Sequence, residues 1–536
     1  MNKLIVPIIA LLTMCQTQVE ANIPRLVVLL SVEELRSDIL DEIYPLLPEG
    51  GLKKLIDEGQ VYSNVKNPIL SADPTASHAM LHTGTTAFAN GIATRRPNIL
   101  SVNGKVSSYN SVFHDEQYIG YATSTRLSPK RLSAPTIADK LWQATGGDAL
   151  IYSLAPNAEE AIIGGGQHAD GVFWIDDYNG KWVSSTYYKE GYPSYMYKLN
   201  EGSESLLNRL KNSVWLPSVS GLSDRQGLSP YISKTVVTQG FKHNFDSNGE
   251  GIAKFKKSAL VNEEVMKAVD IIFTNTEIGK DDVPDFLALN LFAGNHAEAT
   301  RDITPELFDT YYRLDRAIAS LLGKIDGRTG SSQTLIALVG NGQSREFHSR
   351  DEIIGYFHND RCKALMNVFI MAQYGQGNWV EEVTNDGQIF LNRKLIESQK
   401  LNLQDVQSKT ADFLRDFSGI QYAITDHELR ERAVLDSQDN SLFQSCLNRA
   451  TIKERGDVLF ELLPSWAFIR AENLTDSGLY RYGTAPTTFI LRSADLRSQK
   501  IAAPLDIRDI SATICYVLRI RPPTQGRSIG MGVFQN

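Results

Sequence analysis

The chain has 536 residues and a formal net charge of −8, from 54 Lys and Arg against 62 Asp and Glu. A chain of this length can bury a large core, either as one α/β domain with insertions or as two to three domains. The basic residues are scattered rather than clustered, which argues against nucleic acid as a partner.

The first 21 residues have the pattern of a secretory signal. A single Lys precedes an apolar run over residues 4–15, and a polar stretch ends at Ala21. The run is too short to span a bilayer, and no later segment has the apolar length of a membrane helix. We therefore expect residues 1–21 to be a cleaved signal peptide and residues 22–536 to be exported to the periplasm.

Two alternatives to cleavage remain for this leader. One is a retained anchor. The other is a lipid anchor at Cys15, although Met14 is bulky at a position where lipoprotein signals prefer a small residue.

After the leader, apolar β-branched runs alternate with amphipathic segments, which is typical of a mostly parallel sheet covered by helices on both faces. Glycines or prolines mark several of the expected helix ends. The core strands are expected at 25–32, 149–155, 286–294 and 334–342, and the helices at 51–59, 134–147 and 304–326.

Two further regions are expected to add to this α/β core. Residues 171–188 predict a hairpin that turns at 178–180, where Asn-Gly supplies the positive φ of a tight turn. Residues 385–417 predict a strand, a connector and an amphipathic helix. We expect a smaller cap region on the main sheet, with insertions near 185–260 and 375–425.

The cysteines of the mature chain are Cys362, Cys446 and Cys515, an odd number that lie far apart. At most one disulfide can form among them, and the sequence leaves its existence open.

Residues 71–87 read "SADPTASHAMLHTGTTA", and their hydroxyl groups raise the question of a catalytic nucleophile. In the alternative interpretation Asp73-Pro74-Thr75 simply begins a helix. Asp73 would then cap the helix and Pro74 would occupy its first turn. A threonine hydroxyl without a metal ion or an adjacent base is almost fully protonated at neutral pH, which favours the capping interpretation.

The order of several motifs resembles the alkaline phosphatase superfamily, in the branch of the nucleotide pyrophosphatase/phosphodiesterases. The resemblance is to the phosphate-irrepressible alkaline phosphatases of Bacteroidetes in particular. It covers nearly all of the chain after the leader and rests on "SVEELRSDIL", "ASHAMLHTG", "GVFWIDDYNGKWVSSTYY", "TYYRLDRAIASLL", "GQIFLNRKLIE", "GDVLFELLPSW" and "DIRDISATICYVLRIRPP".

This resemblance implies an alkaline-phosphatase-like fold and a centre of two zinc ions. Three Asp and three His of the family hold the ions, which clamp the attacking and leaving oxygens of a phosphoryl transfer. A Thr or Ser at a helix start is the family's nucleophile.

The chain departs from the family at most of the positions that match these residues. Only His296 is an intact ligand match. The remaining ligand positions carry Glu33, Phe292, Asn341, Gly342 and Ala485.

The nucleophile and the substrate-binding positions also differ from the family pattern. Counting back four residues from His78 reaches Pro74, and a one-residue deletion would instead bring Thr75 to the nucleophile position. The substrate-positioning Asn, Lys and Arg of the family are matched by Arg95, Asn157 and Glu159. A carboxylate there would repel a phosphate, and we expect the adjacent arginines 95 and 96 to be solvated.

The sequence therefore predicts an exported pseudoenzyme, with no catalytic residues, no bound zinc and no other cofactor. Its expected role is binding or scaffolding in the cell envelope, with another envelope protein or a small ligand in the old cleft as the partner. The alternative is a phosphate mono- or diester hydrolase that uses Thr75, Glu33 and His296 with one metal ion or none.

Overall fold

The computed structural model of the protein describes most of the chain after the leader. The expected signal peptide and Cys15 lie outside the described residues. The described ranges are 23–69, 73–100, 105–218, 240–299, 302–346, 355–435, 446, 451, 454–463, 466–469 and 481–524.

An 11-stranded, mostly parallel sheet forms the centre of the fold. Its middle strand, β1 (Leu26–Glu33), is parallel to β11 (Asp285–Phe292) on one side and to β12 (Thr334–Gly340) on the other. Beyond β11 lie the parallel strands β6 (Ile151–Ala155) and β7 (Gly171–Ile175). These strands are buried on both faces, as their continuous apolar runs require.

Later parts of the chain complete one edge of this sheet. Strand β21 (Thr487–Arg492) lies antiparallel between β12 and β2 (Gln60–Lys66). Strands β22 (Gln499–Ile501) and β23 (Leu505–Asp506) pair with the outer side of β2. The other edge is formed by β8 (Trp182–Ser185) and β5 (Gly120–Tyr121).

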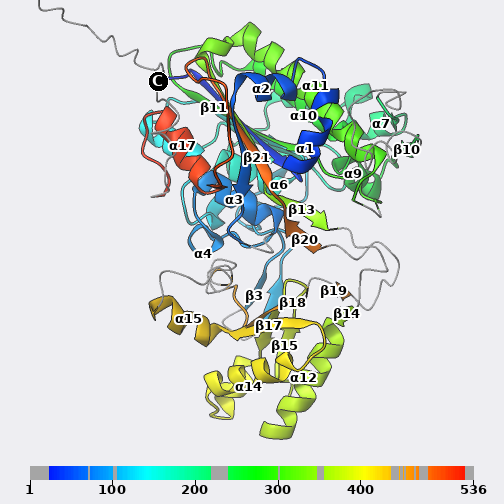
Figure 1. Ribbon diagram of the computed structural model, residues 1–536, viewed down its shortest axis with the longest axis vertical. Helices are drawn as coiled ribbons and strands as arrows, with labels where there is room; N and C mark the ends of the chain where they lie inside the picture. Colours follow the sequence, from blue (N-terminus) through cyan, green and yellow to red (C-terminus); the bar gives the residue numbers. More distant parts are fainter. Residues whose placement is uncertain are drawn as a thin grey trace, which may run out of the picture.

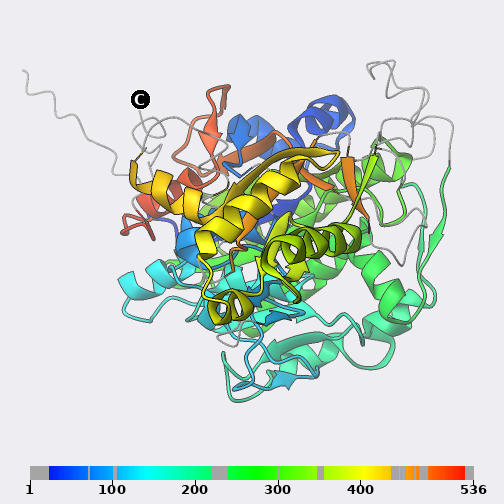
Figure 2. The ribbon, with the colours of Figure 1, turned by 90° about the horizontal axis from the view of Figure 1, so that it is seen from below.

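Helices cover both faces of the sheet, as Figures 1 and 2 show. Successive residues of β1 point to opposite faces, so that Val28 and Leu30 enter one core and Val27 and Leu29 enter the other. The first core is covered by helices α1 (Ser37–Ile43), α2 (Leu52–Glu58), α10 (Leu260–Asn275) and α11 (Pro305–Arg328). The second core is covered by helices α3 (Pro74–Thr83), α5 (Ile137–Ala144), α6 (Ala158–Gly165) and α17 (Asp509–Val517). The α/β fold class is confirmed.

The expected hairpin forms between β7 and β8, but its turn differs from the expectation. Gly180 has a φ of +62°, whereas Asn179 is not among the described residues with positive φ. The Asp176 carboxylate accepts hydrogen bonds from the backbone amides of Tyr178 and Asn179, both at 2.9 Å. The side chain of Asp176 therefore closes the turn, and only the glycine needs the left-handed conformation.

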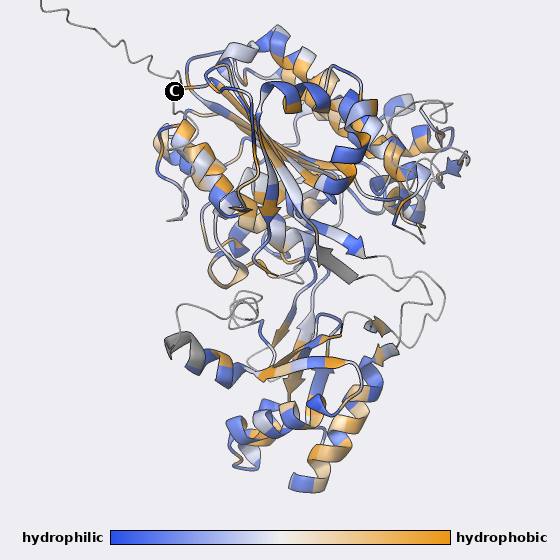
Figure 3. Ribbon diagram, viewed as in Figure 1, coloured by the Kyte–Doolittle hydropathy of each residue, from blue (hydrophilic) through white to orange (hydrophobic). Residues whose placement is uncertain are grey.

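A second lobe lies beyond one end of the main sheet and has a core of its own (Figures 1 and 3). Its antiparallel sheet has the strand order β15 (Val380–Val383), β16 (Gln388–Leu391), β18 (Val458–Leu462) and β17 (Ile420–Thr425). Helices α12 (Asn359–Tyr374), α13 (Arg393–Ser398) and α14 (Leu403–Arg415) supply apolar side chains to that core.

Shorter elements connect these parts. They include α4 (Ala87–Asn90), β3 (Asn98–Leu100), β4 (Val106–Ser108), α7 (Leu206–Leu210), β9 (Val214–Trp215), β10 (His243–Asn244), α9 (Gly249–Lys256), β13 (Gln343–Glu346), β14 (Gly355–His358), α15 (Asp426–Leu435), β19 (Trp466–Ile469) and β20 (Arg481–Thr484).

The cysteines Cys362, Cys446 and Cys515 are all buried, and none of them forms a disulfide in this structure. In the described part of the chain, no helix is both long and apolar enough to cross a membrane.

Candidate functional site

Three of the positions singled out in the sequence lie on neighbouring strands, where those strands end. Glu33 of β1 is in register with Phe292 of β11. The backbone amide of Asn341, just after β12, donates to the Val32 carbonyl at 3.1 Å. Glu33, Phe292 and Asn341 therefore meet at the carboxyl ends of parallel strands, where open α/β sheets place their ligand sites.

Helix α3 begins at this end with Asp73 as its N-cap. The Asp73 carboxylate accepts the backbone amide of Thr75 at 2.8 Å, and Pro74 occupies the first turn, as the capping interpretation expects. Thr75 is buried, and its Oγ1 donates to Oε1 of Glu160 at 2.9 Å. The hydroxyl at the helix start therefore belongs to Thr75, and its partner is a carboxylate that the sequence did not single out.

His78 lies one turn further along α3. Its Nε2 is 3.1 Å from the backbone carbonyl of Glu160, and its ring lies 4.5 Å from that of His82. Nδ1 of His78 is buried without a hydrogen-bond partner among the described residues. Burial lowers the pKa of His78 to about 4, so its imidazole is neutral at pH 7.

Arg95 forms an ion pair with Glu159, so the expectation that both arginines are solvated is wrong for Arg95. Its Nε lies 2.9 Å from the Glu159 carboxylate, and Asp177 is 3.7 Å away. Arg96 is exposed, as expected. Glu159 is buried, which raises its pKa, while the Arg95 charge acts in the opposite direction. Burying a carboxylate without a counter-charge is costly, and the half-buried Arg95 guanidinium supplies that counter-charge.

Asn157 lies two residues before Glu159 in the chain and is the N-cap residue of α6. Its side chain makes no capping hydrogen bond.

A fully buried ion pair joins Glu34 and Arg345, neither of which the sequence pointed to. The Arg345 guanidinium lies 3.3 Å from the Glu34 carboxylate and also donates to the backbone carbonyls of Asn295 and His296. Nζ of Lys257 lies 3.8 Å from the same carboxylate. The one sequence signal is the Glu-Glu pair directly after a buried strand, and nothing local identifies Arg345.

Glu33 lies in the field of these groups. Burial and, to a lesser extent, the neighbouring Glu160 carboxylate raise the pKa of Glu33 to about 8, although the charges of Lys257 and Arg95 act in the opposite direction. The strand ends thus bring together buried or half-buried acidic and basic groups. The acidic members are Glu33, Glu34, Glu159 and Glu160, and the basic ones are Arg95, Lys257 and Arg345.

The remaining ligand-equivalent positions have structural contacts of their own. Both backbone groups of Phe292 bond the Asn262 side chain at 2.8 Å, and its ring is buried in the core. Asn341 Oδ1 accepts the amides of Glu34 at 3.3 Å and Gln343 at 3.1 Å.

Gly342, with a φ of +68°, accepts the amide of Ala485 at 3.2 Å. Ala485 therefore lies beside Gly342, as the resemblance expects. Phe292, Gly342 and Ala485 have no side-chain atom that can ligate zinc, so these positions do not fit a zinc pair.

His296 is on the loop after β11. Its Nε2 lies 3.7 Å from a carboxylate oxygen of Glu306, and its ring lies 4.7 Å from that of His243. Burial lowers the pKa of His296 to about 4.

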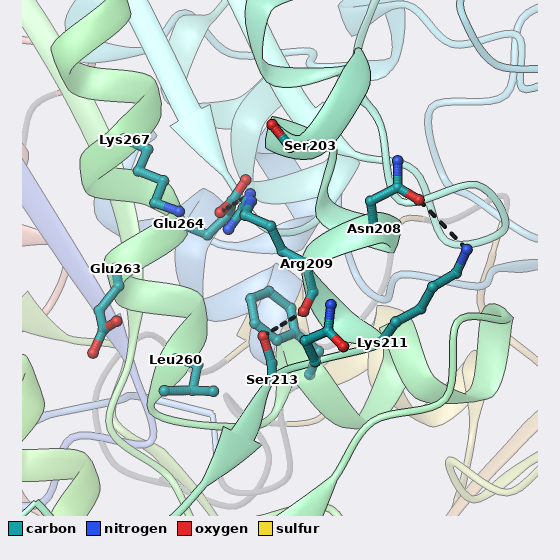
Figure 4. Close-up of a pocket in the computed structure, with 11 residues that line it drawn as sticks. Ser203, Asn208, Arg209, Lys211, Ser213, Leu260, Glu263, Glu264 and Lys267 are labelled. Carbon is teal, nitrogen blue, oxygen red and sulfur yellow. Dashed lines mark hydrogen bonds and ion pairs between the residues drawn. The ribbon is translucent and has the colours of Figure 1, made fainter.

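A separate hollow of about 640 Å³ lies between α7 and α10 (Figure 4). Arg209 reaches from α7 across to Glu264 of α10, with 2.5 Å between the charged atoms. Glu263 pairs with Arg313 at 2.6 Å. Three of the charges that line this hollow, those of Arg209, Glu264 and Glu263, are therefore already paired.

Comparison with known proteins agrees with this architecture. A protein of Myroides odoratus described as a calcium-transporting ATPase is 24% identical over 529 residues, which cover 93% of this chain and 92% of that protein. Alkaline phosphatase PafA of Elizabethkingia meningoseptica is 23% identical over 523 residues, or 94% and 92% of the two chains. A crystal structure of a PafA mutant matches with a TM-score of 0.79 at 21% identity, over 96% of this chain and 99% of that one.

The model of the type I phosphodiesterase/nucleotide pyrophosphatase family matches residues 27–486. The match begins in β1 and ends just after Ala485, so it includes all the strand ends described above. The chain therefore belongs to the type I phosphodiesterase/nucleotide pyrophosphatase family.

Proposed function

We propose that this chain is an exported, catalytically degenerate member of its family that binds a partner in the cell envelope. The partner is another envelope protein or a small ligand at the carboxyl ends of the central strands. The observation that carries the proposal is the buried Arg345 guanidinium, paired with Glu34 next to the His296 backbone.

The charges at the strand ends support this proposal. In the active enzymes that the sequence resembles, zinc ions supply positive charge at this place. Here Arg345 and Lys257 supply it from the protein itself, on the Glu34 side, and Arg95 supplies it beside Glu159. These fixed cations pair with the carboxylates that a metal ion in the same place would need.

The side-chain atoms at the ligand positions also support the proposed loss of catalysis. Each of two closely spaced zinc ions needs anionic or imidazole ligands at most of its coordination positions. Phe292, Gly342 and Ala485 offer none, and the Asn341 amide is already bonded to two backbone amides.

One observation favours the alternative, a phosphate ester hydrolase. The Thr75 hydroxyl donates to the Glu160 carboxylate at 2.9 Å, and a carboxylate within hydrogen-bond distance is a geometrically competent general base. In this alternative Thr75 is the nucleophile and Glu160 accepts its proton.

Activity assays on the purified full chain separate the two functions. We expect no hydrolysis of p-nitrophenyl phosphate or bis-p-nitrophenyl phosphate above the blank, with or without added Zn²⁺. If the wild type turns over either ester and Thr75→Ala or Glu160→Gln abolishes it, the hydrolase is correct. Thr145→Ala, just after α5, is the matched control. Among the described residues, the Thr145 hydroxyl bonds only backbone groups of its own neighbourhood, namely two carbonyls and one amide.

Export has a test of its own. Because of the signal pattern that ends at Ala21, the mature protein should begin at Asn22 when it is isolated from the periplasm. N-terminal peptide sequencing checks this. A lipidated Cys15 or an intact Met1 would contradict it.

A further inference from the structure

Two histidines and a glutamate from three separate segments converge beside the strand ends. His243 belongs to β10, His296 to the loop after β11, and Glu306 to the first turn of α11. Their ligand atoms all lie within 4.8 Å of one another. We propose that His243, His296 and Glu306 bind a single divalent transition-metal ion, at a site that shares only His296 with the ligand positions of the family.

The donor set suits such an ion. Two imidazoles and one carboxylate are found in catalytic zinc sites and in mononuclear iron sites, where the remaining positions are open to water. Metal–ligand distances of about 2.0–2.2 Å place neighbouring ligand atoms of a tetrahedral ion about 3.4 Å apart. The Glu306 oxygen lies 2.8 Å from His243 Nε2 and 3.7 Å from His296 Nε2, on either side of that value. The three ligand atoms all lie within 4.8 Å of one another, so they close onto an ion with side-chain shifts of less than about 1 Å.

The surrounding structure holds two of the ligands in place. Asn295 Oδ1 accepts the His296 amide at 3.1 Å and the Thr304 hydroxyl at 2.6 Å. Thr304 is also the N-cap of α11, so one hydroxyl links the His296 loop to the helix turn that carries Glu306. Supporting hydrogen bonds of this kind orient metal ligands.

The third ligand is oriented by aromatic contacts and by Glu306 itself. The His243 ring lies 5.4 Å from that of Trp215 and 5.6 Å from that of Phe241. Its Nε2 lies 2.8 Å from Glu306 Oε1. This nitrogen already points at the carboxylate, so an ion between them replaces a shared proton.

Binding changes the hydrogen bonds of His296. Nδ1 of His296 now accepts the Glu298 amide at 3.3 Å, near the long limit of such a bond. An ion at Nε2 requires the proton to move to Nδ1, and this contact is then lost. If the three residues only stabilise the fold and bind no ion, the hydrogen bond from the Glu298 amide to His296 Nδ1 remains.

Metal titration of the full chain tests the proposal. The protein is stripped with a chelator, dialysed and titrated with Co²⁺, whose visible absorption reports tetrahedral or five-coordinate binding, and then with Zn²⁺ by calorimetry. We expect one equivalent of either ion to bind. His243→Ala and Glu306→Gln should each weaken binding by more than about tenfold, the scale seen when metal-site partners are removed.

Two control variants locate the ion. His168→Ala removes an imidazole that stacks on Trp142 and should bind as the wild type does. Glu33→Gln alters the family's first ligand position and should also bind normally. Circular dichroism of every variant shows that it is folded.

Two results overturn the inference. One is the absence of binding to the wild type. The other is binding that persists in both His243→Ala and Glu306→Gln. If binding survives in those variants but is lost in Glu33→Gln, the ion occupies the family's own centre, and the proposed loss of that centre fails as well. Failure of the new site alone leaves the proposed function intact.

Discussion

Glu34 combines two features that are unusual in one residue. Its φ is +57°, in the left-handed region that costs a non-glycine residue about 1–2 kcal/mol, and its carboxylate is buried. In this backbone conformation the Glu34 carboxylate faces the Arg345 guanidinium, and the resulting ion pair offsets the conformational cost. The same pair keeps a cation fixed at the strand ends.

Breaking this pair should destabilise the fold strongly. Arg345→Met leaves the Glu34 charge buried with fewer counter-charges, which costs about 3–5 kcal/mol in the free energy of unfolding. The double variant Arg345→Met, Glu34→Gln should recover part of that loss. Urea unfolding measures both.

Arg126→Met is the control for that experiment, since it removes a surface ion pair with Glu116. It should change the stability by about 1 kcal/mol or less. An equally small loss in Arg345→Met would show that the pair does not hold the strand ends together.

The buried imidazole of His78 predicts a pH dependence of stability. Burial lowers its pKa from 6.5 to about 4, so between these values the unfolded chain binds a proton that the folded chain does not. The contribution of His78 to the free energy of unfolding is therefore complete above pH 6.5. It decreases as the pH falls toward 4, by at most about 1.4 kcal/mol per pH unit.

The measurement is urea unfolding at pH 7 and pH 5 of wild type, His78→Gln and His114→Gln. The loss on acidification should be smaller in His78→Gln than in the wild type. It should be unchanged in His114→Gln, whose imidazole is 37% exposed. Equal losses in all three proteins would refute the assignment.

At the scale of elements, the start of α11 depends on one threonine. The Thr304 hydroxyl accepts the Leu307 amide at 3.1 Å and donates to Asn295. Thr304→Ala removes both bonds and should cost about 1–2 kcal/mol in urea unfolding. Ser205→Ala is the control, because the Ser205 side chain makes no capping bond to α7, and it should cost about 0.5 kcal/mol or less. Equal effects would mean that the cap contributes nothing.

Helices and strands with a strong local pattern could be predicted from the sequence, whereas the side-chain contacts between residues far apart in the sequence could not. The expected strand at 25–32 became β1, and the helix expected over 304–326 became α11, since each follows a clear apolar periodicity. The Glu34–Arg345 pair joins residues 311 positions apart, which no local pattern can reveal. Arg95 was expected in solvent because its sequence neighbour is an arginine, and only the fold places Glu159 beside it.

At the scale of the whole molecule, the second lobe is expected to unfold as a unit of its own. Its core contains Phe460, Trp379 and Leu391, all of them fully buried, and none of the three belongs to the clusters of the main sheet. Phe460→Ala should cost about 3–5 kcal/mol within that lobe. Hydrogen exchange should then show faster exchange in β15 to β18, with β1 and β11 unchanged.

Leu289→Ala, in β11, is the reciprocal variant, since Leu289 is buried in the main core. It should raise exchange in the main sheet and leave the lobe protected. Exchange that rises in both parts with either variant would show that the two unfold together.

The place of β2 in the sheet bears on how the chain folds during synthesis. The strand is made early, at residues 60–66, yet its described neighbours β21, β22 and β23 all begin at or after Thr487. While the ribosome adds some four hundred residues, β2 has none of these partners. The contacts between β2 and β21 join residues that are far apart in the sequence, and such contacts slow folding. The sheet edge next to β12 is completed only when nearly the whole polypeptide has emerged, so truncation before β21 should leave a β-strand template exposed to aggregation.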